Sequence, residues 1–259
     1  MEVALITPTA ALNEFASRSK YHLVLADRIL SDEAYREYYA YRSKMGDYIM
    51  LDNCAYELGQ SLSATQLLEC VKGIKPTAMF LPDVRFKTKE TLALVEKALP
   101  QFRERCPDLK LLGVPQGSNL EEVMYCYNQL MQIGVDGFGI YEEIGEVTGL
   151  GRRADFLEYL GGRNAIAFNK TYHCLGMEED VEQIKRLAEH SWVKGVDSAK
   201  PYVYGMFGVS LSQDGPKVPY PHRPKGYFES VPVEEFRSTI HHNITMVQQW
   251  VKDPLANIQ

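Results

Sequence analysis

The chain has 259 residues and a mass of 29.4 kDa, a length that suits one large domain or two small ones and allows a sizeable core. Hydrophobic residues make up 45% and charged residues 24%. Because both fractions are close to globular averages, they exclude disordered, collagen-like and coiled-coil proteins. The net charge of −6 means that any nucleic-acid-binding surface must be a local basic patch on an acidic protein.

Two features of the sequence favour the cytoplasm. No apolar run is long enough to cross a bilayer, and the N-terminus has neither a basic region nor an apolar stretch of signal length. The five cysteines are odd in number and widely spaced. This spacing is typical of reduced, buried thiols and fits neither a disulfide framework nor a zinc knuckle. We therefore expect a cytoplasmic protein without a metal site.

Short β-rich runs alternate with longer helical patterns along the chain. The runs predict eight strands, at residues 3–7, 22–26, 48–52, 78–83, 110–114, 137–140, within 166–175, and at 194–197. Apolar residues three or four apart predict helices at 11–19, 31–45, 63–73, 88–105, 120–133, 153–160 and 178–190. Ser63 with Gln66, and Asn119 before two glutamates, are typical helix N-caps. A last helix is expected at 233–251, after an irregular stretch at 200–230.

Eight strands with helices between them, in a chain of this length, are the arrangement of a (β/α)8 barrel in the α/β class. A doubly wound open sheet is the alternative. Composition does not change along residues 1–199, and we find no internal repeat or low-complexity segment. We therefore expect residues 1–259 to form a single (β/α)8 barrel domain.

Polar side chains end four of the predicted strands, namely Asp52, Asp83, Gln116 and Asp197. The catalytic face of a parallel barrel lies at the carboxyl ends of its strands, so closure of the barrel would bring these side chains to one rim. Each aspartate alone fits a turn or a helix N-cap. Three carboxylates at one rim, however, repel one another unless a ligand or a function offsets the cost. We therefore expect a catalytic or binding site built on these residues.

Residues 215–228 form a proline-rich segment with basic and aromatic side chains and no acid. Positive charge for phosphates, alternating with rings for base stacking, is typical of nucleic-acid binding. A loop that merely crosses the barrel rim is the alternative. The candidate contacts in the segment are Lys217, Tyr220, Arg223, Lys225, Tyr227 and Phe228, and Arg152 and Arg153, with Arg85, Lys87 and Lys89 after Asp83, are expected on the same face.

Six short motifs follow one another between residues 48 and 200. They are Leu-Asp-Asn-Cys-Ala-Tyr at 51–56, Leu-Pro-Asp at 81–83, Gly-Val-Pro-Gln-Gly at 113–117, Val-Asp-Gly-Phe-Gly-Ile at 135–140, Cys-Leu-Gly-Met at 174–177 and Gly-Val-Asp-Ser at 195–198. Each motif alone is weak. Their order within an eightfold βα pattern resembles that of the tRNA-guanine transglycosylase superfamily.

Two departures from the tRNA enzymes indicate which branch the chain resembles. Those enzymes carry a zinc site, built from a Cys-x-Cys-x2-Cys run and a later His, downstream of the nucleophile strand. Here no cysteine follows Cys174 and the chain is much shorter. This compact form is most similar to the DNA transglycosylases of bacteria and phages, the DpdA family, which exchange guanine in DNA for a 7-deazaguanine. The resemblance implies a barrel without a zinc-binding subdomain and no metal or redox cofactor.

The resemblance also implies a role for each strand-end residue. Asp197 is the nucleophile at C1′ of the deoxyribose, and Asp52 manages the proton of the leaving and entering bases. Asp83 and Gln116 read the edge of the guanine. The remaining substrate-binding residues are Gly117 and Gly139, where the backbone approaches the base, and Phe86 and Tyr141, whose rings are candidates for stacking on it.

The implied partners are DNA with a flipped-out guanosine nucleotide and a free 7-deazaguanine base related to preQ0. A homodimer stays open, and the compartment is the host cytoplasm if a phage encodes the protein. Three alternative functions stay open as well. They are a tRNA-guanine transglycosylase, a glycosidase that releases the base to water, and a non-catalytic nucleic-acid-binding subunit, against which the three aspartates argue.

Overall fold

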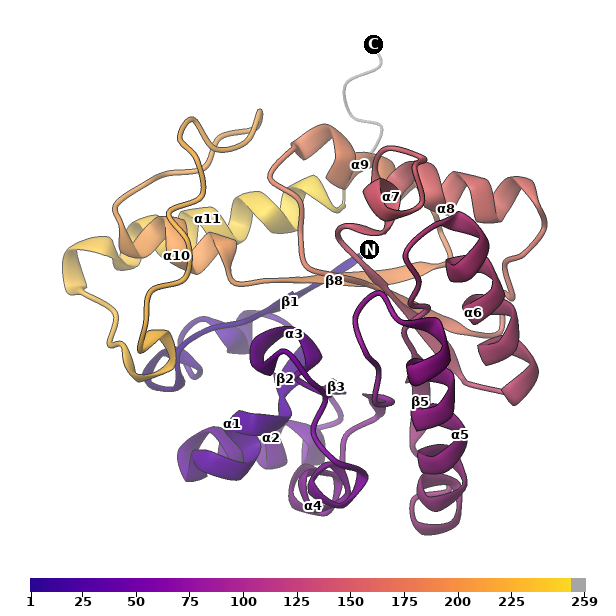
Figure 1. The fold of residues 1–259 in the computed structure, drawn as a ribbon. Coiled ribbons are helices and arrows are strands. Elements are labelled where there is room, and N and C mark those ends of the chain that lie inside the picture. Colours follow the sequence, from indigo (N-terminus) through magenta and orange to yellow (C-terminus); the bar gives the residue numbers. More distant parts are fainter. Residues whose placement is uncertain (253–259) are drawn as a thin grey trace. The chain divides into compact units, whose positions relative to one another are not determined.

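Eight parallel strands alternate with helices along residues 1–252, the part of the chain that the computed structural model describes (Figure 1). The strands are β1 (Glu2–Leu5), β2 (Tyr21–Leu25), β3 (Tyr48–Asp52), β4 (Ala78–Phe80), β5 (Lys110–Gly113), β6 (Gly137–Tyr141), β7 (Thr171–Leu175) and β8 (Val193–Ser198). Their order in the sheet is β1-β8-β7-β6-β5-β4-β3-β2, which is that of a (β/α)8 barrel. The predicted fold class is confirmed, and the doubly wound alternative is wrong because such a sheet reverses its strand order.

The chain divides into two compact units. We call Leu23–His173 the central unit, and Met1–His22 with Cys174–Gln259 the terminal unit. That the whole chain forms a single domain stays a prediction.

The strands of the central unit are buried in continuous apolar runs. Residues 49–51 of β3 and 78–80 of β4 have no exposed surface, and the two strands pair in parallel with Met50 opposite Ala78. Runs without alternation are typical of parallel strands covered on both faces. The helices of this unit are α1 (Ala26–Ser31), α2 (Glu33–Lys44), α3 (Ala55–Leu58), α4 (Ala64–Ile74), α5 (Thr88–Arg105), α6 (Leu120–Ile133), α7 (Ile144–Val147) and α8 (Arg153–Gly162).

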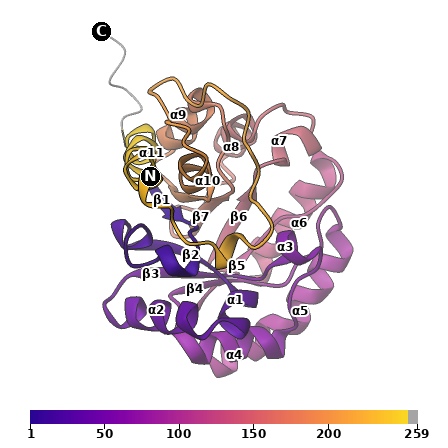
Figure 2. The ribbon, with the colours of Figure 1, turned by 90° about the vertical axis from the view of Figure 1, so that its left-hand side faces the viewer.

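The predicted capping residues begin two of these helices. Ser63 and Gln66 form a capping box at the start of α4, and the Asn119 side chain accepts a hydrogen bond from the backbone N–H of Glu122 in α6. Helix α6 ends at Gly134, whose φ of +89° lies in the left-handed region that favours glycine. Both views show α5 beside α6 and α2 beside α4 (Figures 1 and 2).

In the terminal unit β1 pairs with β8, and Ala4 lies opposite Asp197. Its α-helices are α9 (Val181–Glu189), α10 (Lys200–Met206) and α11 (Arg237–Trp250). Helices α10 and α11 approach closely at Gly205 (Figure 2), where a Cβ would lie 2.5 Å from a side-chain carbon of Ile240. Within residues 1–252, no helix combines the length and the apolar character needed to cross a membrane.

The helix expected at 11–19 is absent from the structure, which has two 3-10 turns there, η1 (Thr9–Ala11) and η2 (Ala16–Arg18). The hydroxyl of Ser17 donates to the backbone carbonyl of Asn13 at 2.7 Å. The backbone N–H groups of Leu12 and Ser19 donate to the carbonyls of Thr9 and Ala16, three positions earlier, which is the hydrogen-bond pattern of 3-10 turns.

The helix expected at 31–45 is also divided. Asp32 has an extended backbone and caps α2 through a hydrogen bond from the Tyr35 N–H, so α1 ends before it and α2 begins after it.

The stretch 200–230, expected to be irregular, begins with α10 and contains a 3-10 turn, η3 (Tyr227–Glu229). Pro201 does not prevent α10, because an N–H in the first helical turn has no partner within the helix. The helix expected at 233–251 is a 3-10 turn, η4 (Glu234–Phe236), followed by α11.

Candidate active site

Asp83, which follows β4 in the central unit, is held by two side-chain amides. Its side chain is buried. Its Oδ1 accepts a hydrogen bond from Nδ2 of Asn53 at 2.6 Å, and its Oδ2 accepts one from Nε2 of Gln116 at 2.6 Å. Asn53 follows β3 and Gln116 follows β5, so three neighbouring strand ends supply the cluster.

Backbone donors fix the direction in which the two amides face. Oδ1 of Asn53 accepts from the N–H of Ala55 at 2.9 Å, and Oε1 of Gln116 accepts from the N–H of Phe86 at 2.8 Å. Because each amide oxygen faces an N–H, each NH₂ group faces Asp83. A carboxylate accepts about four hydrogen bonds, of which these two amides supply two. Each oxygen of Asp83 therefore keeps capacity for a further donor.

The buried position of Asp83 raises the pKa of its carboxyl group to about 6, because the charged form is poorly solvated there. Hydrogen bonds from Asn53 and Gln116, and the positive charge of Arg85, favour the anion and limit the rise. Asp83 is therefore an anionic hydrogen-bond acceptor at neutral pH, and it becomes protonated in weakly acidic solution.

Phe86 has a backbone φ of +62°, a strained conformation for a bulky side chain. Its N–H donates to the side chain of Gln116, and the hydroxyl of Thr88 donates to the Gln116 carbonyl at 2.7 Å. These bonds tie the turn after β4 to the turn after β5. The phenyl ring stays exposed.

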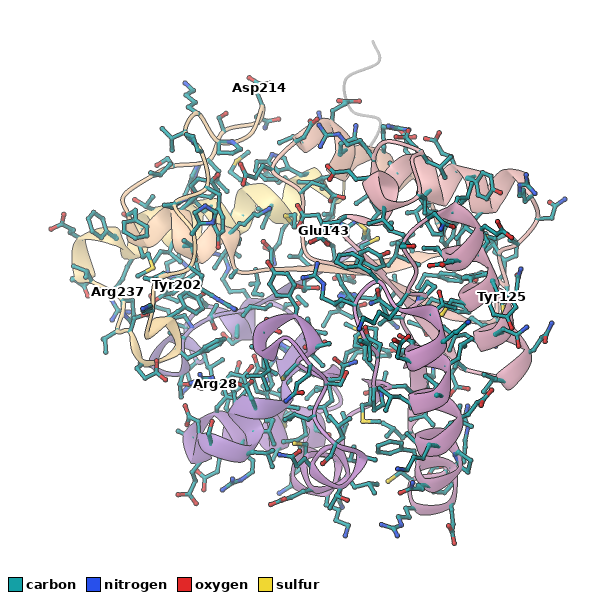
Figure 3. All side chains as sticks on the ribbon, viewed as in Figure 1. Arg28, Tyr125, Glu143, Tyr202, Asp214 and Arg237 are labelled. Carbon is teal, nitrogen blue, oxygen red and sulfur yellow. The ribbon has the colours of Figure 1, made fainter. Side chains whose placement is uncertain are left out.

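Exposed rings and a cation lie beside this cluster. The guanidinium of Arg85 lies 4.8 Å from the ring centroid of Phe86 and 5.1 Å from that of Tyr56. It also pairs with Glu143, labelled in Figure 3, at 2.8 Å. Tyr56 is 68% exposed. Exposed rings that flank a cation are suited to stacking with a nucleic-acid base.

Tyr141, the last residue of β6, contacts Phe86 edge to face, with ring centroids 6.1 Å apart. Unlike the Phe86 ring, its side chain is buried. Burial raises the pKa of the Tyr141 phenol, and the nearby negative charge of Glu143 acts in the same direction. Tyr141 is therefore a neutral phenol beside the Asp83 cluster.

Asp52, the last residue of β3, is partly buried and accepts a hydrogen bond from the N–H of Cys54 at 2.9 Å. Cys54 precedes α3 with a φ of +65°. Burial, reinforced by the charge of Asp52, raises the pKa of the Cys54 thiol. The thiol is therefore neutral, and the role of Asp52 as the proton carrier stays a prediction.

Asp197, near the end of β8 in the terminal unit, has a buried side chain. Its Oδ1 accepts a hydrogen bond from the N–H of Gly176 at 3.0 Å. This bond joins the motif at 174–177 to the motif at 195–198. That Asp197 shares one rim with Asp52, Asp83 and Gln116 stays a prediction.

The basic side chains of segment 215–228 differ in their surroundings. Lys217 and Lys225 are exposed. Asp214, which just precedes the segment, lies at the tip of the loop that follows α10 (Figure 3). Tyr220 is partly exposed and stacks edge to face on Tyr204, with centroids 5.6 Å apart. The two lysines and Tyr220 remain candidates for nucleic-acid contacts.

The other rings of the segment are not available for stacking on a base. Tyr227 is 3% and Phe228 7% exposed, and the hydroxyl of Tyr227 donates to the backbone carbonyl of Ile6 at 2.7 Å. The guanidinium of Arg223 lies over both rings, 5.7 Å and 5.4 Å from their centroids. The expectation that Tyr227 and Phe228 contact nucleic acid is wrong, because they anchor the segment to the core.

The adjacent arginines of α8 have different roles. Arg153 is 1% exposed, and its Nη1 donates to the backbone carbonyl of Ile140 at 3.0 Å. The expectation that Arg153 contacts nucleic acid is therefore wrong. Arg152 is exposed and caps the helix with its N–H donating to Asp155 at 2.7 Å, so it remains a candidate.

Of the two glycines predicted to approach the base, Gly117 has a clear structural requirement. A Cβ there would lie 2.6 Å from the backbone nitrogen of Val123, so only glycine allows the start of α6 to pack this closely. Gly139 lies within buried β6. Contact of either glycine with a base stays a prediction. Among the described residues 1–252, no three His, Cys, Asp or Glu side chains are grouped so as to hold a metal ion.

Asn53 and Tyr56 of the Asp83 region are not among the predicted site residues, whereas Arg85 is one of the basic residues predicted on the catalytic face. Asn53 directly follows a strand end, and a search there for amides as well as carboxylates would have found it. Tyr56 carries no signal beyond its place in the motif at 51–56, because its contact with Arg85 joins the turns after two different strands.

No family model matches this sequence, and no curated protein is similar enough to count as a relative. The fold and the site define an α/β barrel protein with a buried carboxylate that accepts from N–H donors. Function is inferred from these residues and from the motifs that contain them.

Proposed function

We propose that the protein is a base-exchange transglycosylase that replaces guanine in DNA by a 7-deazaguanine base. The observation that carries this proposal is the Asp83 carboxylate, oriented by two amides and with acceptor capacity left on both oxygens. Guanine presents two neighbouring N–H donors, at N1 and at the 2-amino group, beside the O6 acceptor. Asp83 accepts from the two donors, and the second N–H of Gln116 donates to O6. An edge with this pattern matches guanine and its 7-deaza analogues and not adenine, cytosine or thymine.

The exposed rings beside Asp83 support a nucleotide substrate. Tyr56 and Phe86 present flat apolar surfaces around the Arg85 guanidinium, and base stacking on such surfaces tolerates any sequence. Because a duplex hides both C1′ and the base edge, the target nucleotide must be flipped out before reaction.

The proposed reaction proceeds in two displacements at C1′. A carboxylate oxygen of Asp197 attacks C1′ while the C1′–N9 bond breaks, and guanine leaves with the electron pair and takes a proton from Asp52. The entering base then gives its N9 proton to Asp52, and its N9 displaces Asp197 from C1′. Both carboxyl groups return to their initial states. The roles of Asp197 and Asp52 rest on the resemblance of the motifs at 195–198 and 51–56.

Incubation of the protein with guanine-containing DNA and a radiolabelled 7-deazaguanine base tests the function. We expect label in the DNA and an equal amount of released guanine. Released guanine with abasic sites and no label would indicate a glycosidase, and DNA binding without either product would indicate a non-catalytic subunit. Faster labelling of a matched tRNA would show that the polymer substrate is RNA.

Replacing the two exposed lysines of segment 215–228, Lys217→Ala with Lys225→Ala, is expected to weaken DNA binding. The slope of log affinity against log salt is negative, and each lost phosphate contact reduces its magnitude by ~0.7–0.9. The double variant should therefore have a slope that is shallower by roughly 1.4–1.8. The measurement is a salt titration of DNA affinity. Arg223 is left in place because it packs on Tyr227 and Phe228.

The matched control is Lys72→Ala with Lys97→Ala, which changes the net charge equally at exposed positions of α4 and α5. This control should keep the wild-type slope. Equal slopes for the two double variants would remove segment 215–228 from the DNA contacts.

A further inference from the structure

The hydroxyl of Tyr141 is buried and has no hydrogen-bond partner within the described part of the chain. The side chain is 8% exposed and lies at the end of β6. Buried hydroxyl groups in folded proteins nearly always have a partner, and one without a partner requires an explanation. A ligand that supplies the missing hydrogen bond is such an explanation.

The surroundings of this hydroxyl locate it at the proposed base site. The Phe86 ring contacts the Tyr141 ring, and the N–H of Phe86 donates to Gln116, which in turn donates to Asp83. The charges of Glu143, Arg85 and Asp83 all act on the phenol. Tyr141 therefore belongs to the same group of side chains as the carboxylate that is proposed to hold the base.

We propose that the Tyr141 hydroxyl donates a hydrogen bond to the Hoogsteen edge, O6 or N7, of the purine held by Asp83. This inference rests on the proposed function and adds a specificity-determining residue to it. Asp83 accepts from the donors at N1 and the 2-amino group, so the polar atoms of guanine on the neighbouring edge are acceptors. The carboxylates of Asp83 and Glu143 cannot donate to these acceptors, whereas a neutral phenol can.

Calorimetric titration of the full chain with two free bases tests the inference. Guanine carries acceptors at both O6 and N7, whereas 7-deazaguanine carries only O6. Tyr141→Phe removes the hydroxyl and keeps the ring, so the expected loss of guanine affinity is about five- to tenfold. If 7-deazaguanine affinity is unchanged, the partner is N7, and if both affinities fall, the partner is O6.

Thermal unfolding separates this role from a structural one. Because the hydroxyl is unpaired in the free protein, Tyr141→Phe should leave the Tm of the free protein unchanged or raise it, while the increase in Tm caused by guanine becomes smaller. Tyr125→Phe, at an exposed position on α6 (Figure 3), is the matched control and should change neither quantity.

Two results would overturn the inference in distinguishable ways. If the wild-type protein binds guanine and Tyr141→Phe binds both bases equally well, Tyr141 does not read the base although the proposed function survives. If the wild-type protein binds neither base, the proposed function and this inference both fail.

Discussion

Asp83→Asn is expected to weaken the binding of free guanine by about 30- to 1000-fold, or ~2–4 kcal/mol. The asparagine has a similar shape, but its NH₂ group replaces one of the two carboxylate oxygens. That oxygen is the acceptor for the base and for one of the amides of Asn53 and Gln116. Those two amides cannot reverse without losing their bonds from Ala55 and Phe86. Titration calorimetry with guanine measures the loss.

The affinity of the wild-type protein for guanine should also depend on pH. Guanine donors bind the Asp83 anion, so binding lowers the pKa of this carboxyl group from its free value of about 6. Affinity is therefore fully present above pH ~6 and falls by about tenfold per pH unit below it. Asp83→Asn should remove this dependence, whereas Asp108→Asn, at an exposed position, should keep it. Affinity that rises on acidification would contradict the assignment of Asp83, even if the variant failed to fold.

The strands and several helix ends follow from local sequence, which is why they could be predicted. Continuous apolar runs such as 49–51 identify buried parallel strands, and Ser63 and Asn119 begin helices through hydrogen bonds to residues three positions away. The turns at 9–18 could not be predicted in this way. Their apolar spacing is the same as that of a true helix, so spacing alone does not distinguish the two.

The prediction that Asp83 and Gln116 lie together is confirmed because topology alone positions them, whereas other predictions failed because contacts made by individual side chains decide. Asp83 and Gln116 end neighbouring strands, so the parallel sheet brings them together whatever their side chains do. Arg152 and Arg153 look equivalent in the sequence, but Arg153 is buried and donates to the carbonyl of Ile140, whereas Arg152 is exposed. Tyr227 likewise fits stacking on a base or anchoring to the core, and its bond to Ile6, more than 200 positions away in the chain, selects the core.

The roles of the two candidate catalytic aspartates can be separated because only the nucleophile becomes covalently attached to DNA. Asp197→Asn is expected to reduce base exchange by on the order of 10³–10⁶-fold, since an amide is a much poorer nucleophile than a carboxylate. Its Oδ1 can still accept from the N–H of Gly176, so the fold and DNA binding should persist. Rapid denaturation of the reacting mixture followed by electrophoresis detects the covalent protein–DNA adduct.

Comparison with Asp52→Asn shows which of the two aspartates is the nucleophile. Loss of the proton carrier slows both displacements, but the atom that attacks C1′ belongs to Asp197 and not to Asp52. The covalent adduct should therefore still form in Asp52→Asn and should be absent in Asp197→Asn. Both variants replace a carboxyl group by an amide of similar shape, so a general loss of folding or of DNA binding would lower both signals alike. An adduct that forms in Asp197→Asn and is absent in Asp52→Asn would show that Asp52 is the nucleophile and Asp197 the proton carrier. Near-normal base exchange by Asp197→Asn would show that Asp197 is not the nucleophile.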